Sequence, residues 1–176
     1  MNEEGKRFLN DLTEGKRWEY IALDILNRED KDTRYWHSNS LEEDRAGIDI
    51  YSQNKERPDE ITAIDVKAYH APIKKGAKFK GVFIETDGKK GRGWLLDENK
   101  KTKQYLFIVG CRGDEFDAMY LVSRAVVMRY YCYMVTRSDI LKRTNTRAGG
   151  FILPYEDLEN MSCVIISGGD ENEYIQ

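Results

Sequence analysis

The sequence predicts an α/β fold in which a central mixed β-sheet is flanked by helices. Strand patterns dominate the middle of the chain, and helical patterns lie toward both ends. The length of 176 residues suits one domain, and no internal repeat or interdomain linker divides the sequence. We therefore expect residues 1–176 to form a single domain, with an acidic, frayed tail from about residue 168.

The first expected element is a helix over residues 13–27. Its apolar residues recur at the spacing i, i+3, i+4, i+7 and i+8 from Trp18 onward, and Thr13 is suited to be the N-cap. Glu19 lies about 100° around the helix from Trp18, at the edge of the apolar stripe. A carboxylate there can reach over the end of a sheet toward a metal, but it can equally be an ordinary surface glutamate.

Strands follow the helix. Residues 33–39 are rich in β-branched and aromatic types and predict a first strand, whereas the charged stretch 41–47 predicts a loop. AGIDIYSQ (46–53) and ITAIDVKAYH (61–70) predict two strands separated by a polar break. KGVFIETDG (80–88) predicts a further strand, which the Asp-Gly turn signal ends.

The second half of the chain is more apolar. The segment 104–112 is hydrophobic almost throughout, which is typical of a strand buried on both faces. Residues 118–123 predict a strand that runs into a helix over 124–135, and residues 161–167 predict a last apolar strand or packing segment.

Two carboxylates and one lysine fall on neighbouring predicted strands. Asp65 and Lys67 are two residues apart and therefore share a face of their strand, and hairpin pairing can place Asp49 beside them. Each aspartate lies between two apolar residues, where a buried carboxylate must be paired, hydrogen-bonded or metal-bound. A half-exposed strand whose Asp and Lys face water produces the same alternation, so both interpretations stay open at this point.

The order of these residues resembles the PD-(D/E)xK nuclease superfamily, which has the restriction-endonuclease-like fold. The family pattern is a glutamate on a helix, an aspartate in a strand, and an acidic-x-Lys motif in the next strand. Here these are Glu19, GID at 47–49 and DVK at 65–67. The chain has Ile48 in place of the proline of the family name. The resemblance covers roughly residues 14–110, and its layout is similar to that of Holliday-junction resolvases and phage-type nucleases.

The resemblance implies a Mg²⁺-dependent DNA endonuclease that hydrolyses phosphodiester bonds in duplex or branched DNA, with Mn²⁺ able to replace Mg²⁺. Magnesium prefers oxygen ligands, commonly one or two carboxylates with waters and phosphates. Lys67 would orient the attacking water and offset negative charge in the transition state. The implied catalytic residues are Glu19, Asp49, Asp65 and Lys67, and the implied metal ligands are Asp49 and Asp65, with Glu19 and Glu85 as further candidates.

Basic residues concentrate between positions 74 and 103, although the net charge of the chain is −3. A basic segment on an acidic protein fits contact with phosphates beside a carboxylate-rich metal site. A pair of solvated, lysine-rich loops explains the same composition equally well. The residues expected to contact DNA are Lys74, Lys75, Lys89, Lys90 and Arg92.

Other classes are less well supported by the sequence. No apolar run reaches the ~20 residues that span a bilayer, and the charged N-terminal stretch lacks the apolar core of a signal peptide. We therefore expect a cytoplasmic protein without a membrane partner. Two alternatives remain open: a nucleic-acid-binding protein that has the same fold but does not cleave, and a structural or interaction subunit. Many relatives cut two strands as dimers, so a homodimer is also a candidate assembly.

Overall fold

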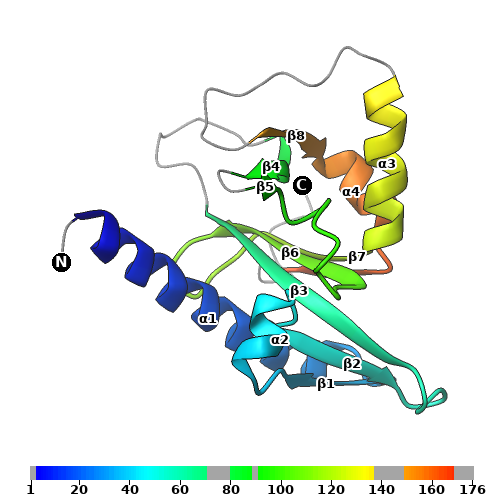
Figure 1. The fold of residues 1–176 in the computed structure, drawn as a ribbon. Coiled ribbons are helices and arrows are strands. Elements are labelled where there is room, and N and C mark those ends of the chain that lie inside the picture. Colours follow the sequence, from blue (N-terminus) through cyan, green and yellow to red (C-terminus); the bar gives the residue numbers. More distant parts are fainter. Residues whose placement is uncertain (1–2, 71–79, 89–90, 137–148, 169–176) are drawn as a thin grey trace, which may run out of the picture.

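A computed structural model describes residues 3–70, 80–88, 91–136 and 149–168 (Figure 1). These residues form helices and strands that belong to two sheets. In chain order the elements are α1 (Glu3–Glu29), β1 (Thr33–His37), α2 (Leu41–Arg45), β2 (Ile50–Asn54), β3 (Ile61–His70), β4 (Gly81–Gly88), β5 (Gly91–Arg92), β6 (Gln104–Cys111), β7 (Ala118–Ser123), α3 (Arg124–Thr136), β8 (Gly149–Pro154), α4 (Tyr155–Met161) and β9 (Val164–Ser167).

The larger sheet has the strand order β1-β2-β3-β6-β7-β9. Strands β1, β2 and β3 form an antiparallel meander, β3 pairs with β6 in parallel, and β6, β7 and β9 are antiparallel. The prediction of a mixed sheet flanked by helices is therefore confirmed. One element differs from it, because the strand at 80–88 leaves the central sheet and forms a second sheet of order β5-β4-β8.

Helix α1 covers one face of the six-stranded sheet (Figure 1). Its apolar stripe is buried, with Trp18 only 1% exposed. The stripe belongs to one cluster with buried side chains from β1, β2, β3, β6 and β7, among them Ile64 on β3 and Leu106 on β6. This packing fixes the position of α1, and therefore of Glu19, relative to β3.

The opposite face of the same sheet is covered by the second sheet and by α3 and α4 (Figure 1). Tyr105, Phe107 and Val109 of β6 point into this second cluster, while Leu106 and Ile108 point toward α1. Strand β6 is thus apolar on both faces because both are covered, as its composition predicts. The molecule consequently has three layers over β6 and β7.

Two predicted features near the N-terminus are wrong. Helix α1 begins at Glu3, so Thr13 lies inside the helix and is not its N-cap. The preceding residues are mostly helix formers without proline, which lets the helix extend beyond its buried stripe. The predicted loop at 41–47 contains helix α2, which starts with a capping box. In that box the Glu43 N–H donates to Ser40 Oγ, and the Ser40 N–H donates to Glu43 Oε2.

The remaining predicted elements occur close to their expected positions. The strand expected at 46–53 begins at Ile50, so Asp49 lies immediately before β2. The tail expected from about residue 168 falls almost wholly on 169–176, which lie outside the described residues. None of the described helices combines the length and apolar character that crossing a bilayer requires.

Candidate active site

Asp49 and Asp65 lie opposite each other where β2 begins. The antiparallel register pairs Ile50 with Ile64, and one step further along it brings Asp49 to Asp65. The Asp49 N–H donates to the Ile64 carbonyl oxygen at 2.9 Å, which extends the hydrogen-bond ladder one residue before the start of β2. The Asp49 carboxylate also accepts the Val66 N–H through Oδ2 at 2.7 Å. The side chain is therefore held against β3 by the backbone N–H of Val66, the residue after Asp65.

Both aspartates are buried, with 8% of Asp49 and 4% of Asp65 exposed. Burial raises the pKa of Asp49 to about 6, and the neighbouring charge of Asp65 acts in the same direction. The hydrogen bond from Val66 and the positive charge of Lys67 oppose this rise. Two buried carboxylates repel each other when both are ionised. Uptake of a proton or binding of a cation between them relieves this repulsion.

Lys67 is the positive charge of this cluster. Its Nζ lies 2.5 Å from Asp65 Oδ1 and stands over the ring of Trp94, at 5.4 Å from the ring centroid. Glu85 of β4 approaches from the second sheet: burial raises the pKa of Glu85, and the charge of Lys67 opposes that rise. Lys67 is thus surrounded by two carboxylates and an aromatic ring.

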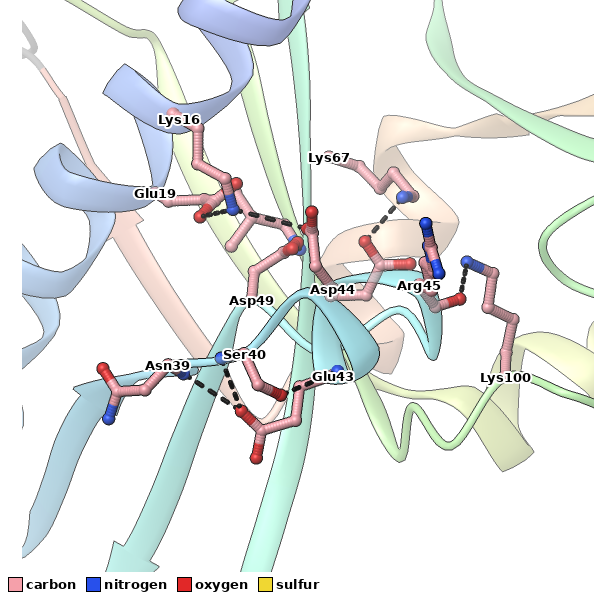
Figure 2. Close-up of polar contacts among 12 residues, drawn as sticks. Lys16, Glu19, Asn39, Ser40, Glu43, Asp44, Arg45, Asp49, Lys67 and Lys100 are labelled. Atoms are coloured by element: carbon pink, nitrogen blue, oxygen red, sulfur yellow. Dashed lines mark hydrogen bonds and ion pairs between the residues drawn. The ribbon is translucent and has the colours of Figure 1, made fainter.

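Glu19 lies on α1, and its carboxylate is close enough to Asp49 for the two charges to interact. It is 7% exposed and accepts an ion pair from Lys16 at 2.9 Å. Burial raises the pKa of Glu19 and the charge of Asp49 raises it further, while Lys16 lowers it. Lys16 also lies 3.3 Å from Asp44 of α2, so one lysine links α1 to α2 beside the site (Figure 2).

The site spans the sheet rather than lying on one face. Asp65 and Lys67 alternate with Ile64 and Val66, which pack toward α1, so the charged pair faces the second layer. Figure 2 shows Glu19 on the α1 side and Lys67 on the other side of the strand, with Asp49 between them. Within the part of the chain that the structure describes, no cluster of three or more His, Cys, Asp or Glu side chains is arranged to hold a metal ion.

Gly47 of the GID motif has a local structural role. Its φ of 73° lies in the left-handed region, and an added Cβ would meet Thr102 Oγ1 at 2.8 Å and Lys100 Cδ at 2.9 Å. The Thr102 hydroxyl donates to the Gly47 carbonyl oxygen at 2.6 Å. Glycine therefore lets the chain turn tightly against the segment before β6 and enter β2 with Asp49 facing Asp65.

Several contributing residues were not identified from the sequence. Lys16, Trp94 and Thr102 each contact a predicted site residue or its motif. Lys16 carried a readable signal, because a lysine and a glutamate three residues apart are neighbours on a helix. Trp94 and Thr102 come from segments distant in sequence, and no local pattern indicates where those segments lie.

The residues expected to contact DNA are mostly not described. Lys74, Lys75, Lys89 and Lys90 lie outside the described residues. Arg92 is exposed in β5 and forms an ion pair with Glu98. Of the five residues expected to contact DNA, Arg92 is therefore the one that the structure describes, and its charge already has a partner.

Comparison with protein-family models, with curated proteins and with solved structures found no match.

Proposed function

We propose that this protein is a Mg²⁺-dependent DNA endonuclease of the PD-(D/E)xK type. The observation that carries the proposal is the buried pair of facing aspartates, Asp49 and Asp65, with Lys67 held 2.5 Å from the second of them. Burying such a set costs folding free energy. A purely structural role gives no reason for β3 to carry this charged set between α1 and the second sheet.

The donor set fits a hard cation. Asp49 and Asp65 offer only oxygen ligands, and Mg²⁺ is commonly held by one or two carboxylates together with waters and substrate phosphates. We assign these two residues as ligands, and the resemblance adds Glu19 and Glu85 as further candidates, although no three carboxylates of the described residues already surround one position. When bound, Mg²⁺ polarises the scissile phosphate and stabilises the leaving oxygen.

The chain's own groups have separate tasks in this proposal. Lys67 orients the attacking water and offsets the negative charge that grows on the phosphate. Trp94 limits the positions of the Lys67 ammonium group, and Asp65 hydrogen-bonds to it. Asp49 must be ionised to bind a cation, so affinity for Mg²⁺ should rise as the pH passes through about 6.

Three further parts of the proposal follow the same resemblance. The order of α1, the Asp49 entry to β2 and the motif on β3 supports a restriction-endonuclease-like core. Duplex or branched DNA is the proposed substrate, and a homodimer acting in the cytoplasm is the proposed form. The basic residues Lys89 and Lys90 would contact the DNA backbone together with Arg92.

The test is cleavage of supercoiled plasmid and of a synthetic four-way junction by the purified protein. We expect cleavage with Mg²⁺ or Mn²⁺, none with EDTA, and none for Asp65→Asn or Asp49→Asn. Asp59→Asn is the matched control, because Asp59 is an exposed aspartate in the turn between β2 and β3. Full cleavage by Asp65→Asn would show that the assigned site is wrong.

The same experiment separates the alternatives. Tight, salt-sensitive binding of DNA without cleavage under any of these conditions would favour a non-cleaving nucleic-acid-binding protein. Absence of both binding and cleavage would favour a structural or interaction subunit.

A further inference from the structure

The second layer covers only part of the six-stranded sheet. Among the described residues, the cluster on that side takes side chains from β6 and β7 but only Tyr69 from β3, and none from β1 or β2. Figure 1 shows β1 and β2 extending away from β4, β8, α3 and α4. Within the described parts of the chain, the face of β1 and β2 opposite α1 therefore has no second layer above it, and α2 borders it at the Asp49 end.

This face carries two aromatic side chains, Trp36 and Tyr51, which are both half-buried. Tyr35 and Ile50 point into the cluster beneath α1, so their strand neighbours Trp36 and Tyr51 point to the other face. Trp36 and Tyr51 are direct cross-strand partners, and their rings stack with centroids 5.7 Å apart. The guanidinium of Arg34 lies over the Trp36 ring at 5.7 Å from its centroid.

The charge pattern favours a base over a phosphate at these rings. The Tyr51 hydroxyl donates to Glu43 Oε1 at 2.7 Å, so a carboxylate stands beside the ring and would repel a phosphate. Arg34 is exposed, and no carboxylate of the described residues lies within ion-pair distance of it. A flat, uncharged base can stack on the rings while Arg34 takes the adjacent phosphate.

The rings are also continuous with the proposed site. Tyr51 pairs with Ala63 on β3, and Asp65 lies two residues further along β3 on the same face as Ala63, which corresponds to about 7 Å along the strand. A nucleotide stacked on Tyr51 would therefore be a near neighbour of the phosphate bound at Asp49 and Asp65. In duplex DNA the bases are stacked and paired internally, and only unpaired bases offer a free face.

We propose that Trp36, Tyr51 and Arg34 form a platform that binds unpaired bases of a DNA strand next to the scissile phosphate. This inference rests on the proposed nuclease function and narrows its substrate to DNA with single-stranded nucleotides at the cleavage point, such as a branch or flap. Aromatic stacking is tolerant of base identity, so the platform would recognise strand state rather than sequence.

The test measures binding of fluorescein-labelled 20-nucleotide oligothymidylate and of a 20-base-pair duplex by fluorescence anisotropy in EDTA. Trp36→Ala should weaken binding of the single strand about 10-fold, with less than about 2-fold change for the duplex. Trp36→Phe keeps an aromatic ring and should stay within about 3-fold of the parent chain on both. The phenylalanine variant also shows whether loss in the alanine variant reflects the ring.

Tyr20→Ala is the matched control. Tyr20 is an exposed aromatic on α1 that contacts His37 on the opposite face of β1, so its removal should leave both affinities unchanged. Three results would overturn the platform: no binding of the single strand by the parent chain, unchanged single-strand binding by Trp36→Ala, or an equal loss on the duplex. Melting temperatures of all variants separate these results from unfolding.

The platform and the nuclease proposal fail in different ways. Binding in EDTA does not depend on cleavage, so a protein that never cleaves but loses single-strand affinity in Trp36→Ala would keep the platform and lose the nuclease. Mg²⁺-dependent cleavage with unchanged single-strand binding in Trp36→Ala would keep the nuclease and lose the platform.

Discussion

Strands β3 and β6 are parallel neighbours in one sheet, yet they treat the same layer differently. In register, Asp65 lies beside Tyr105 and Lys67 lies beside Phe107. Tyr105 and Phe107 belong to the apolar cluster beneath the second sheet, and both are 0% exposed. On their other face the two strands agree, because Val66 and Leu106 both pack toward α1.

The two strands therefore differ in the free energy of burying their side chains: β6 buries apolar groups, whereas β3 buries charged groups beneath the same layer. On β6 every covered position is apolar, which is the stable arrangement for a strand between two layers. On β3 the same layer receives a carboxylate and an ammonium group, and Trp94 stands at the boundary, contacting Tyr105 on one side and Lys67 on the other. Natural proteins violate such rules mainly at functional places.

The largest expected effect is on cleavage by Lys67→Met. The substitution gives β3 an apolar side chain where β6 has Phe107, and it removes the charge that offsets the transition state. Loss of one such group typically lowers the rate by about 10²–10³-fold. The measurement is the rate of plasmid relaxation in Mg²⁺ at fixed enzyme concentration.

Lys55→Met is the control for this variant. Lys55 is an exposed lysine in the turn between β2 and β3, and its ammonium group donates to the carbonyl oxygen of Lys31. It should cleave at the parental rate. Equal rates for Lys67→Met and the parent chain would mean that the charged pair on β3 has no part in catalysis.

The second effect is on the free energy of unfolding, and it is measured with substitutions that make this face of β3 apolar like that of β6. Lys67→Met alone leaves Asp65 buried without its partner and should lower the free energy of unfolding by about 1–3 kcal/mol, less than for a fully buried pair because Lys67 is partly exposed. Adding Asp65→Leu removes the unpaired carboxylate and relieves its repulsion of Asp49. The double variant should match or exceed the parent chain.

Urea denaturation of the two single variants and the double variant measures the coupling between the two positions. Additive losses, with the double variant least stable of all, would show that the polar pair stabilises the fold and that β3 is not a strained version of β6.

The sequence predicted that β3 has a charged face and that β6 is apolar on both faces, but it did not predict the second sheet that packs over them. The period of two placed Asp65 and Lys67 on one face, and the continuous apolar run indicated that β6 is covered twice. The layer that covers Lys67 was missed, because the strand at 80–88 looks the same whether it pairs with β3 or with β8. Tertiary packing determines which strands pair, and the local periodicity of a strand does not indicate its partner. The helix α2 was readable, since Ser40 and Glu43 form a capping box in the sequence itself.

A third effect depends on pH and concerns Asp49. Its pKa of about 6 in the folded chain lies above the value of about 3.9 expected when unfolded. Well below pH 4 the group is protonated in both states and contributes nothing. As the pH rises from about 4 to about 6, the unfolded state loses its proton before the folded state does, so the free energy of unfolding falls by on the order of 3 kcal/mol. Asp49→Asn should remove this loss and still accept the Val66 N–H.

Urea denaturation at pH 3 and pH 7.5 checks the sign. Asp49→Asn should be more stable than the parent chain at pH 7.5 and equal to it near pH 3, while Asp59→Asn should follow the parent chain at both. A gap of the opposite sign at pH 7.5 would mean that the Asp49 charge is compensated in the fold.

The smallest expected effect is at Tyr69, where β3 returns to the pattern of β6. Its ring packs in the same cluster as Phe107 at 6.2 Å between ring centroids, and its hydroxyl donates to the Phe83 carbonyl oxygen at 2.6 Å, which ties β3 to the second sheet. Tyr69→Phe removes only this hydrogen bond and should lower the free energy of unfolding by about 1 kcal/mol. Cleavage should be unchanged, because the ring and the position of Lys67 are kept. If cleavage instead fell as far as in Lys67→Met, the Tyr69 hydroxyl would be required for catalysis. The candidate site would then extend along β3 beyond Lys67 and Trp94.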